Sequence, residues 1–418
     1  MMKRLSLIIL LSLAIFAFTG QMTALAVSGV SLYVDGIKRN SDVPPVINNG
    51  RVLVPFRSAG EALNAYVEYY PANKTIVAQS NGITINLQID SKTAYLNGRE
   101  VILDSAPLLR NGRALIPMRF FGEAFGCSVE WNSVTDSVHI TSQVKTMEVT
   151  AFYALGDSRT SSWTNLFGTP YPQNAVGNTG RISTLALGWY SLDGNGNLIT
   201  DSSSGWRKPK GWEQVLEAAK QYNLRTEMVV QLTDKGGVLA SLLKDDGASS
   251  NAIDEIAAEA ENYAGVNLDF EGLGWNDTEE DQIIVQQDYN HFVGRLSKKL
   301  ADKGIELTLT LHPLNSAYHG YDYASLGKAA DRIIIMAYDY GSKPEPLSLV
   351  SQAVELAIAK VPAQKLILGI TAVGETAESI QTKIGLAKQY NLKGIALWRL
   401  GLITPQMWDT LGRTVKPE

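Results

Sequence analysis

The longer, C-terminal part of the chain consists of short apolar runs that alternate with segments of helical spacing. The apolar runs predict β-strands at residues 149–155, 182–190, 225–232, 265–271, 305–312, 332–339, 365–371 and 394–400. Between most of them, apolar residues recur every three or four positions, as in GWEQVLEAAKQYN, which predicts amphipathic helices. Eight strands in this rhythm over about 270 residues predict an α/β fold of the (β/α)₈ TIM-barrel type. A doubly wound open sheet is disfavoured because no glycine-rich phosphate loop follows the first strand.

The preceding part of the chain contains an internal repeat. The segment GRVLVPFRSAGEALNAYVEY starts at Gly50 and matches GRALIPMRFFGEAFGCSVEW, which starts at Gly112, so the offset is 112 − 50 = 62 residues. Each copy predicts a hairpin, at Asp35-Gly36 and at Asn97-Gly98, then a short helix opened by a proline, then alternating strands. A unit this small cannot bury a good core alone, so we expect the two copies to pack into one small α+β domain.

The first 26 residues have the pattern of a secretory signal peptide. Lys3 and Arg4 precede the apolar run 5–18, and the segment Thr23-Ala24-Leu25-Ala26 offers an A-x-A cleavage site. The alternative, a membrane anchor, is disfavoured because the run is shorter than the roughly 20 residues of a membrane span. We therefore expect export, cleavage after Ala26 and no membrane span in the mature chain. The expected organisation is a signal peptide at 1–26, a repeat domain at 27–145 and a barrel at 146–418.

Composition narrows the functions that such a chain can have. Loss of the two basic residues of the signal peptide changes the formal net charge from −5 to −5 − 2 = −7, which argues against nucleic acid as a partner. Residues 27–141 carry ten basic and ten acidic side chains, so they show no footprint of a polyanion site. Cys127 is the only cysteine, and the four histidines lack metal-ligand spacing. We expect no disulfide, no metal and no cofactor.

Polar residues share one face of the fourth predicted strand, GVNLDFE. Asn267, Asp269 and Glu271 alternate with apolar residues, so their side chains lie on the same face. Such a face is costly to bury unless it lines a site. In a TIM barrel, functional side chains gather at the C-terminal ends of the strands, where Asp269 and Glu271 stand. Other candidates at predicted strand ends are Tyr338 and Asp339 on strand six and Trp398 on strand eight.

Three motifs in residues 147–418 resemble those of the family 18 glycoside hydrolases. The fourth-strand motif reads Ala264-Gly265-Val266-Asn267-Leu268-Asp269-Phe270-Glu271, the sixth-strand motif is Met336-Ala337-Tyr338-Asp339, and Trp398 stands in GIALWRLGL. Within the family, the chain resembles the bacterial branch that includes spore-cortex and cell-wall N-acetylglucosaminidases. Ala264 and Asn267 replace two aspartates of the family motif, which leaves the rate and the pH optimum open. Asn267 retains the ability to hydrogen-bond Asp269.

The resemblance implies substrate-assisted, retaining hydrolysis, in which the 2-acetamido oxygen of the substrate attacks the anomeric carbon. It implies that Glu271 acts as general acid and then as base, that Asp269 binds the acetamido N–H, and that Tyr338 holds the acetamido carbonyl. Two close carboxyls oppose joint ionisation, which favours a protonated Glu271 near neutral pH. The expected substrate-binding residues are Asn267, Asp339, Trp398, Met336 and Tyr153.

The repeat resembles the domain named after the N-terminal region of copper amine oxidases, which recurs in exported proteins of Gram-positive bacteria. The matching residues are Gly50-Arg51, Val54-Pro55, Arg57 and Glu61-Ala62, with Gly112-Arg113, Ile116-Pro117, Arg119 and Glu123-Ala124 in the second copy. The resemblance implies neither copper nor an oxidase, and suggests an accessory module at the cell envelope. Within each copy the arginine and glutamate stand one helical turn apart, so we expect a structural ion pair, with ligand binding as the alternative.

Together these features predict a secreted hydrolase of β-1,4-linked N-acetylglucosamine glycans, with peptidoglycan preferred to chitin, associated with the cell wall or the spore envelope. A non-catalytic, lectin-like protein is one alternative, although the intact Glu271 argues against it. An envelope scaffold that works through residues 27–145 is another. Residues 372–393, 22 in number, separate strands seven and eight, so the insertion that deepens the cleft of some chitinases is absent and a shallower groove is expected.

Overall fold

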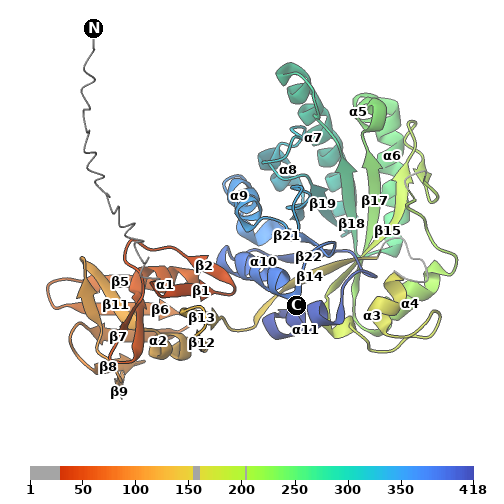
Figure 1. The fold of residues 1–418 in the computed structure, drawn as a ribbon. Helices are drawn as coiled ribbons and strands as arrows, with labels where there is room; N and C mark the ends of the chain where they lie inside the picture. Colours follow the sequence, from red (N-terminus) through yellow and green to blue (C-terminus); the bar gives the residue numbers. More distant parts are fainter. Residues whose placement is uncertain (1–28, 154–160, 203–204) are drawn as a thin grey trace, which may run out of the picture.

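The computed structural model describes residues 29–153, 161–202 and 205–418. A small β-rich domain lies at one end and a barrel with its helices at the other (Figure 1). The signal peptide predicted at 1–26 lies outside the described residues. Among the residues that are described, no helix is both long and apolar enough to cross a membrane.

Eight parallel strands close the barrel. They are β14 (Lys145–Tyr153), β15 (Thr184–Leu192), β17 (Arg225–Thr233), β18 (Gly265–Glu271), β19 (Glu306–Leu311), β20 (Arg332–Ile335), β21 (Leu366–Thr371) and β22 (Gly394–Trp398). Each strand pairs with the next in this order, and β14 pairs with both β22 and β15, which closes the ring. The predicted (β/α)₈ barrel is therefore confirmed. Two short strands extend the sheet, β16 (Leu198–Ile199) beside β15 and β23 (Val415–Pro417) beside β14.

The prediction for strand six was four residues too long. β20 ends at Ile335, and Tyr338 and Asp339 lie in the segment that follows it. Asp339 has a φ of 65°, a left-handed conformation that cannot continue a strand. Its backbone N–H donates to Glu345 Oε1 at 2.8 Å instead of to a neighbouring strand.

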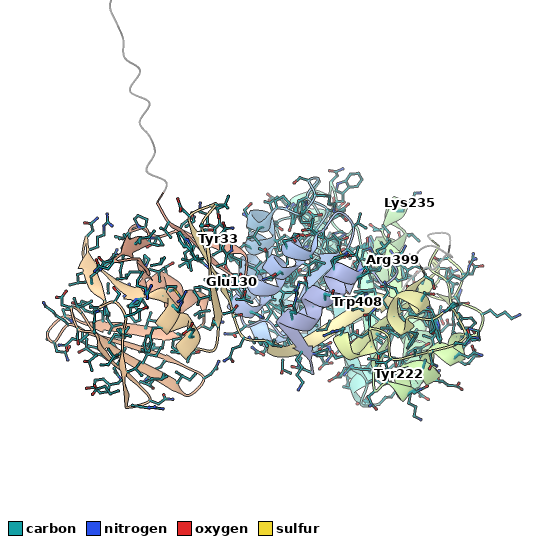
Figure 2. All side chains as sticks on the ribbon, turned by 60° about the horizontal axis from the view of Figure 1, so that its bottom comes forward. Tyr33, Glu130, Tyr222, Lys235, Arg399 and Trp408 are labelled. Atoms are coloured by element: carbon teal, nitrogen blue, oxygen red, sulfur yellow. The ribbon has the colours of Figure 1, made fainter. Side chains whose placement is uncertain are left out.

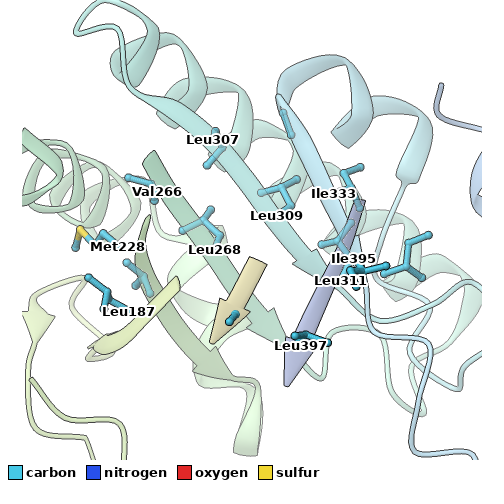
Figure 3. Packing of buried hydrophobic residues seen from close by; sticks show 14 of the residues in the cluster. Leu187, Met228, Val266, Leu268, Leu307, Leu309, Leu311, Ile333, Ile395 and Leu397 are labelled. Carbon is cyan, nitrogen blue, oxygen red and sulfur yellow. The ribbon is translucent and has the colours of Figure 1, made fainter. Parts of the chain in front are cut away.

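Helices cover the outside of the barrel (Figure 1). They are α3 (Ser162–Phe167), α4 (Trp212–Gln221), α5 (Val238–Lys244), α6 (Asp246–Glu259), α7 (Glu279–Ala301), α8 (Tyr323–Ala329), α9 (Leu347–Ile358), α10 (Ala377–Gln389) and α11 (Pro405–Thr414). Alternate strand residues such as Val266, Leu268 and Leu309 are fully buried in the apolar cluster that includes residues of these helices, and Figure 3 shows several of them along neighbouring strands. The connection 372–393 contains α10 and no further strand, as predicted.

The opposite strand face carries a buried ionic cluster near the N-terminal ends of the strands. Arg332 lies 3.3 Å from Glu227, 3.6 Å from Glu148 and 2.6 Å from Glu306. Asn267 joins this cluster, because its Nδ2 donates to Glu227 at 3.2 Å. The lower interior of the barrel is thus polar but paired, as buried charges require.

The repeat domain follows the predicted offset element by element. The first copy contains β1 (Ser31–Val34), β2 (Ile37–Arg39), β3 (Val46–Asn48), β4 (Arg51–Pro55), α1 (Phe56–Ala62), β5 (Tyr66–Tyr70) and β6 (Thr75–Ser80). The second copy contains β8 (Thr93–Leu96), β9 (Arg99–Ile102), β10 (Leu108–Arg110), β11 (Arg113–Pro117), α2 (Met118–Ala124), β12 (Ser128–Asn132) and β13 (Ser137–Thr141). An additional strand, β7 (Ile83–Gln88), follows the first copy.

The two copies are interleaved, which confirms that they pack together. β1 of the first copy pairs with β13 of the second, β8 of the second pairs with β7, and β4 pairs with β11. Phe56 and Phe121, from the two helices, meet edge to face with ring centroids 6.1 Å apart in a shared core. Each copy therefore completes a sheet of the other.

Ion pairs also cross between the copies, and the sequence did not reveal them. Arg51 pairs with Asp104, and Arg113 pairs with Asp42 at 2.7 Å, so the two bridges are related by the repeat. The pair expected within the first helix is present but long, with 4.0 Å between Arg57 Nε and Glu61 Oε1. In the described part of the chain, Arg119 and Glu123 form no such pair, so that expectation was wrong for the second copy.

The repeat domain joins the barrel without a flexible linker. β13 ends at Thr141 and the first barrel strand, β14, begins at Lys145. Lys388 at the end of α10 is buried, and its Nζ donates to Ser142 Oγ at 3.1 Å and to the carbonyl oxygen of Gln143 at 3.0 Å. Asn64 of the repeat domain donates to the Lys388 carbonyl oxygen at 3.0 Å. The junction is thus packed against α10.

Candidate active site

The two predicted catalytic carboxyls stand together at the end of β18. In the parallel pairing with β17, Asp269 lies opposite Gln231 and Glu271 lies opposite Thr233. Asp269 is 3% exposed, whereas Glu271, the last residue of the strand, is partly exposed. One carboxyl is therefore inside the barrel and the other reaches its C-terminal rim, where TIM barrels carry their chemistry.

Burial and mutual contact shift the titration of both carboxyls upwards. Burial, then the charge and hydrogen bond of Glu271, raise the pKa of Asp269 well above its ordinary value. Burial also raises the pKa of Glu271, and the charge of Asp339 adds to this rise, while hydrogen bonds with Gln231 and Asp269 oppose it. Two carboxyls this close retain a proton between them above the pH at which an isolated carboxyl loses it. The pair can therefore hold a proton, as a general acid requires, at a pH above the range of an ordinary carboxyl.

One oxygen of this pair is unsatisfied. Asp269 Oδ1 is buried and accepts no hydrogen bond from the described residues. A buried carboxyl oxygen without a donor costs about 1–3 kcal/mol, so it favours a donor brought by a ligand. The site thus offers an acceptor beside a proton donor.

Tyr338 lies close to both carboxyls although it comes from the segment after β20. Burial, then the charges of Asp269 and Glu271, raise the pKa of its hydroxyl well above the ordinary value. The hydroxyl therefore remains protonated and can donate a hydrogen bond. A Cβ on Gly369 of β21 would lie 3.3 Å from the Tyr338 ring and 2.6 Å from the Ile335 carbonyl oxygen, so a glycine at 369 leaves room for this approach. Met336, in the same segment, is buried.

Aromatic side chains lie at the end of β22 and β14. Trp398 is the last residue of β22 and is partly exposed. Its ring lies 5.3 Å from that of Phe152 and 5.6 Å from that of Trp206. Phe152, Trp206 and Trp398 belong to one apolar cluster and form the apolar wall of the upper barrel. Tyr153 ends β14 on the opposite strand face, in the cluster between the strands and the helices, where it meets Trp189 edge to face at 6.2 Å. The expectation that Tyr153 lines the pocket was therefore wrong, because the strand alternation turns its side chain outwards.

The expectation that Asn267 hydrogen-bonds Asp269 was wrong. The Asn267 amide donates to Glu227, and its Oδ1 accepts from Thr310 Oγ1 at 2.8 Å. The side chain is fully buried, below the carboxyl pair, in the ionic cluster of the lower barrel. An amide serves there because it can both donate and accept between fixed partners.

Residues 151–377, more than half of the 418 residues, match the family model of the glycosyl hydrolases family 18. The chain belongs to this family. Residues 33–140 match the model of the copper amine oxidase N-terminal domain. Both resemblances seen in the sequence are thereby confirmed.

Several relatives of this family 18 protein come from Bacillus subtilis (strain 168). The cortical fragment-lytic enzyme is 25% identical over 239 residues, which are 40% of this chain and 54% of the relative. The uncharacterized glycosylase YvbX is 24% identical over 311 residues, which are 56% of this chain and 85% of the relative. The chain thus spans about half the length of the first of these relatives.

Solved structures of the same fold include the Bacillus cereus spore cortex-lytic enzyme SleL, with a TM-score of 0.53, 18% identity, and coverage of 66% of this chain and 76% of that chain. A class V chitinase from Pseudomonas fluorescens Pf-5 gives a TM-score of 0.54 and 19% identity, with 64% and 99% coverage. At these identities the likeness concerns the fold.

Asp339 departs from its expected place in this family 18 site. Its side chain is 80% exposed and pairs with Lys343 at 3.3 Å, outside the carboxyl pair. Its charge still acts on Glu271 and raises the pKa of that residue. Among described residues, no group of three or more His, Cys, Asp or Glu side chains is arranged to hold a metal ion.

A buried network that sequence reasoning missed fixes the segment carrying Tyr338 and Asp339. Glu345 accepts the backbone N–H groups of Asp339 at 2.8 Å and Tyr340 at 3.1 Å. Glu375 in turn accepts the backbone N–H of Glu345 at 2.8 Å and pairs with buried Lys383 at 2.6 Å. Trp206, beside Trp398, was also missed. Glu345 stands between two prolines and Trp206 in a polar loop, so neither carries a local signal of its partners.

Proposed function

We propose that the barrel hydrolyses β-1,4-linked N-acetylglucosamine glycans, peptidoglycan in preference to chitin, by substrate-assisted retaining catalysis. The observation that carries the proposal is the unpaired, buried Oδ1 of Asp269 beside Glu271, in a chain that belongs to the family 18 glycosyl hydrolases. Three relatives are named cortical fragment-lytic enzyme and two solved structures are spore cortex-lytic enzymes, which supports a peptidoglycan substrate.

In the first step, the acetamido carbonyl oxygen of the bound sugar attacks its own anomeric carbon. The bond to the leaving oxygen breaks, and Glu271 gives its proton to that oxygen. Asp269 Oδ1 accepts the acetamido N–H, which aligns the nucleophile and stabilises the positive charge of the oxazolinium ring. The Tyr338 hydroxyl, which remains protonated, donates to the acetamido oxygen.

In the second step, ionised Glu271 takes a proton from water, whose oxygen attacks the anomeric carbon and opens the ring. The acetamido group is restored and Glu271 is protonated again, so the cycle closes with the original configuration. Trp398 supplies an apolar surface for the sugar, with Met336 at the side of the pocket. Asn267 lies below the carboxyl pair and holds β18 in place through its hydrogen bonds. Asp339 lies at the rim, where its negative charge raises the pKa of Glu271.

The test compares release of reducing ends from peptidoglycan sacculi, spore cortex and chitin oligomers by the chain without its first 26 residues. We expect Glu271→Gln to lower release by roughly 10²–10⁴-fold while binding persists. The matched control is Glu217→Gln, on the exposed face of α4, which should leave release unchanged. Equal release by Glu271→Gln and the parent would exclude this mechanism.

The non-catalytic alternative gives a different result in the same experiment. A lectin-like barrel would retain sacculi or chitin oligomers but release no reducing ends, with or without Glu271.

We further propose that the chain is exported through the signal-like pattern of residues 1–26 and acts at the cell wall or spore envelope. Its presence in washed wall fractions, and the sequence of its mature N-terminus, test this part.

A further inference from the structure

The repeat domain carries two solvent-filled grooves that are related by the internal repeat. The first encloses about 650 Å³ and is lined by, among others, Asp42, Pro55, Arg57, Tyr69, Gly112 and Arg113. The second encloses about 380 Å³ and is lined by, among others, Asp104, Pro117, Arg119, Trp131, Gly50 and Arg51. Each of these residues in one groove stands 62 positions from its counterpart in the other, so the same groove has been built twice.

Each groove is shared between the copies. Its carboxylate and its first arginine form one of the cross-copy ion pairs, Arg113 with Asp42 or Arg51 with Asp104. The second arginine comes from the first turn of the helix, and the aromatic residue comes from β5 or β12. The ion pair fixes a guanidinium and a carboxylate side by side, so that donors and acceptors are oriented before a ligand arrives.

The two copies have diverged at many positions but are alike in kind at six positions that line both grooves. Outside them, Lys74 of the first copy corresponds to Asp136 of the second, and Asp35 to Asn97. At these equivalent positions, both grooves contain two arginines, an aspartate, a glycine, a proline and an aromatic residue. Packing does not account for the shared arginine, because the Arg57 side chain is 74% exposed, nor for Trp131, which is 40% exposed, although its counterpart Tyr69 is partly buried against the domain core. Exposed residues retained in two copies are consistent with a shared ligand.

The chemistry of the grooves indicates a carbohydrate. An accessible aromatic ring offers a flat apolar face, and the paired guanidinium and carboxylate offer several directed hydrogen bonds, which suits a pyranose with one apolar face and a rim of hydroxyls. The charged residues lining the second groove, Arg51, Arg119, Asp104 and Glu130, cancel, whereas the first groove has two more basic than acidic residues. Two related sites in one domain suit a ligand that repeats along its own length.

We infer that the repeat domain binds a carbohydrate polymer through both grooves, with Tyr69 and Trp131 as the aromatic contacts and Arg57 and Arg119 as ligand donors. That this polymer is the glycan cut by the barrel rests on the proposed function. The binding itself does not, because the grooves lie in another domain. Figure 2 places the repeat domain, with Tyr33 and Glu130, at the end of the molecule away from Tyr222 and Lys235 of the barrel.

The experiment measures retention by purified peptidoglycan sacculi, in the Glu271→Gln background so that nothing is cut. We expect Tyr69→Ala and Trp131→Ala each to weaken retention about tenfold or more, and the double variant to weaken it further, because two-site attachment is lost. Tyr95→Ala, an aromatic on β8 outside both grooves that is 42% exposed against 40% for Trp131, is the matched control. Because Tyr69 packs against the domain core, thermal unfolding is measured for all four variants, and Arg57→Gln, at an exposed position, replaces Tyr69→Ala if that variant unfolds at a lower temperature than the parent.

Several outcomes would overturn the inference. One is retention of the double variant at the level of the parent, and another is an equal loss with Tyr95→Ala. Retention that disappears when anionic polymers are stripped from the sacculi would assign the grooves to a phosphate-rich polymer instead of a glycan. Hydrolysis of short chitin oligomers by the same variants with Glu271 restored should be unchanged. Loss of that activity would indicate a folding defect, in which case Arg119→Gln, at an exposed position, replaces Trp131→Ala.

Discussion

Asp269 and Glu271 stand two residues apart on one strand face, yet their surroundings differ. Asp269 is enclosed and has one oxygen without a donor, whereas Glu271 reaches the rim and is influenced by the charge of Asp339. A carboxyl that must exchange protons with water and with a leaving group needs access, while one that only accepts an N–H does not. The difference in exposure therefore agrees with the separate roles proposed for the two residues.

Asp339→Asn should shift the pH dependence of hydrolysis. Burial is the main cause of the raised pKa of Glu271, and the negative charge of Asp339 raises it further. Removing that charge lowers the pKa of Glu271, so the proton required for general acid catalysis is lost at lower pH. The basic limb of kcat/KM against pH should therefore move towards lower pH. The shift should shrink at 1 M salt, because Asp339 is exposed and its charge is screened.

The control for this shift is Asp277→Asn, an exposed aspartate in the loop before α7. Its profile should coincide with that of the parent. A basic limb of Asp339→Asn that moves to higher pH, or does not move, would contradict the electrostatic assignment.

At the scale of elements, sequence periodicity predicted the bounds of a strand correctly where one face of the strand had to be polar and the other apolar. The bounds of β18 match the prediction at both ends, because its inner residues are polar and its outer residues apolar. Strand six failed because Met336-Ala337-Tyr338 continues the apolar pattern although the backbone turns there. The N–H groups of Ala337 and Tyr338 donate to the carbonyl oxygens of Ile335 and Met336 at 2.8 Å, and Glu345 then binds Asp339 and Tyr340 from beyond the segment. The hydrophobic pattern of adjacent residues gives no information on a hydrogen-bond partner such as Glu345, which comes from a later segment.

Distance along the chain explains the other omissions. Arg51 and Asp104 are 53 positions apart, and Arg332 and Glu227 are 105 positions apart. Neither pair falls within a helical turn or a hairpin, so no local spacing connects them. Residues of the candidate site could be named where a motif carries them, including Tyr338, which lies after β20. Partners that come from loops without a motif, such as Trp206 and Lys343, could not.

Glu345→Gln should loosen the segment after β20. Glu345 accepts two backbone N–H groups and pairs with Lys343, and an amide can accept with one oxygen and has no charge. We expect a loss of about 1–3 kcal/mol in the free energy of unfolding and a fall in kcat larger than the change in KM, because Tyr338 is displaced. Glu355→Gln on α9 serves as the control. Unchanged kcat would show that the network supports the fold and not Tyr338.

Arg332→Met should destabilise the barrel in a pH-dependent way. Without the guanidinium, Glu148 loses its ion pair and Glu227 retains only the longer contact with Arg225 at 3.9 Å, which costs about 3–5 kcal/mol at neutral pH. Burial already raises the pKa of Glu148, and loss of Arg332, whose charge opposes that rise, raises it more. The deficit is therefore largest above the folded pKa and decreases as the pH falls and the carboxyls take up protons. Urea unfolding at pH 7.5 and pH 4.5 measures this, and an equal deficit at both would contradict it.

At the scale of the whole molecule, the two domains meet through α10. Lys388 donates from the barrel side to Ser142 and Gln143, while Asp35 accepts the Ser142 N–H at 2.8 Å. These contacts lie at residues 142–144, the short connection between the domains. They therefore fix the two domains relative to each other at the point where the chain passes between them.

Lys388→Met should weaken this junction without affecting either domain. The apolar side chain leaves the Gln143 carbonyl oxygen without its donor, which costs about 1–3 kcal/mol. We expect faster proteolytic cleavage at residues 141–145 and unchanged hydrolysis of short chitin oligomers. Lys360→Met, at an exposed position after α9, is the control. Proteolysis at the parental rate would mean that other contacts hold the junction.

The start of the barrel has a further consequence. β7 begins at Ile83 and β14 begins at Lys145, which are 145 − 83 = 62 positions apart. The first strand of the barrel therefore occupies the place of the strand that would end the second repeat. A polymer bound by the repeat domain would thus reach the active site of the barrel at a fixed distance from the bound segment. Cleavage of long chains should then yield fragments clustered around a preferred length, instead of the broad distribution that random cutting produces.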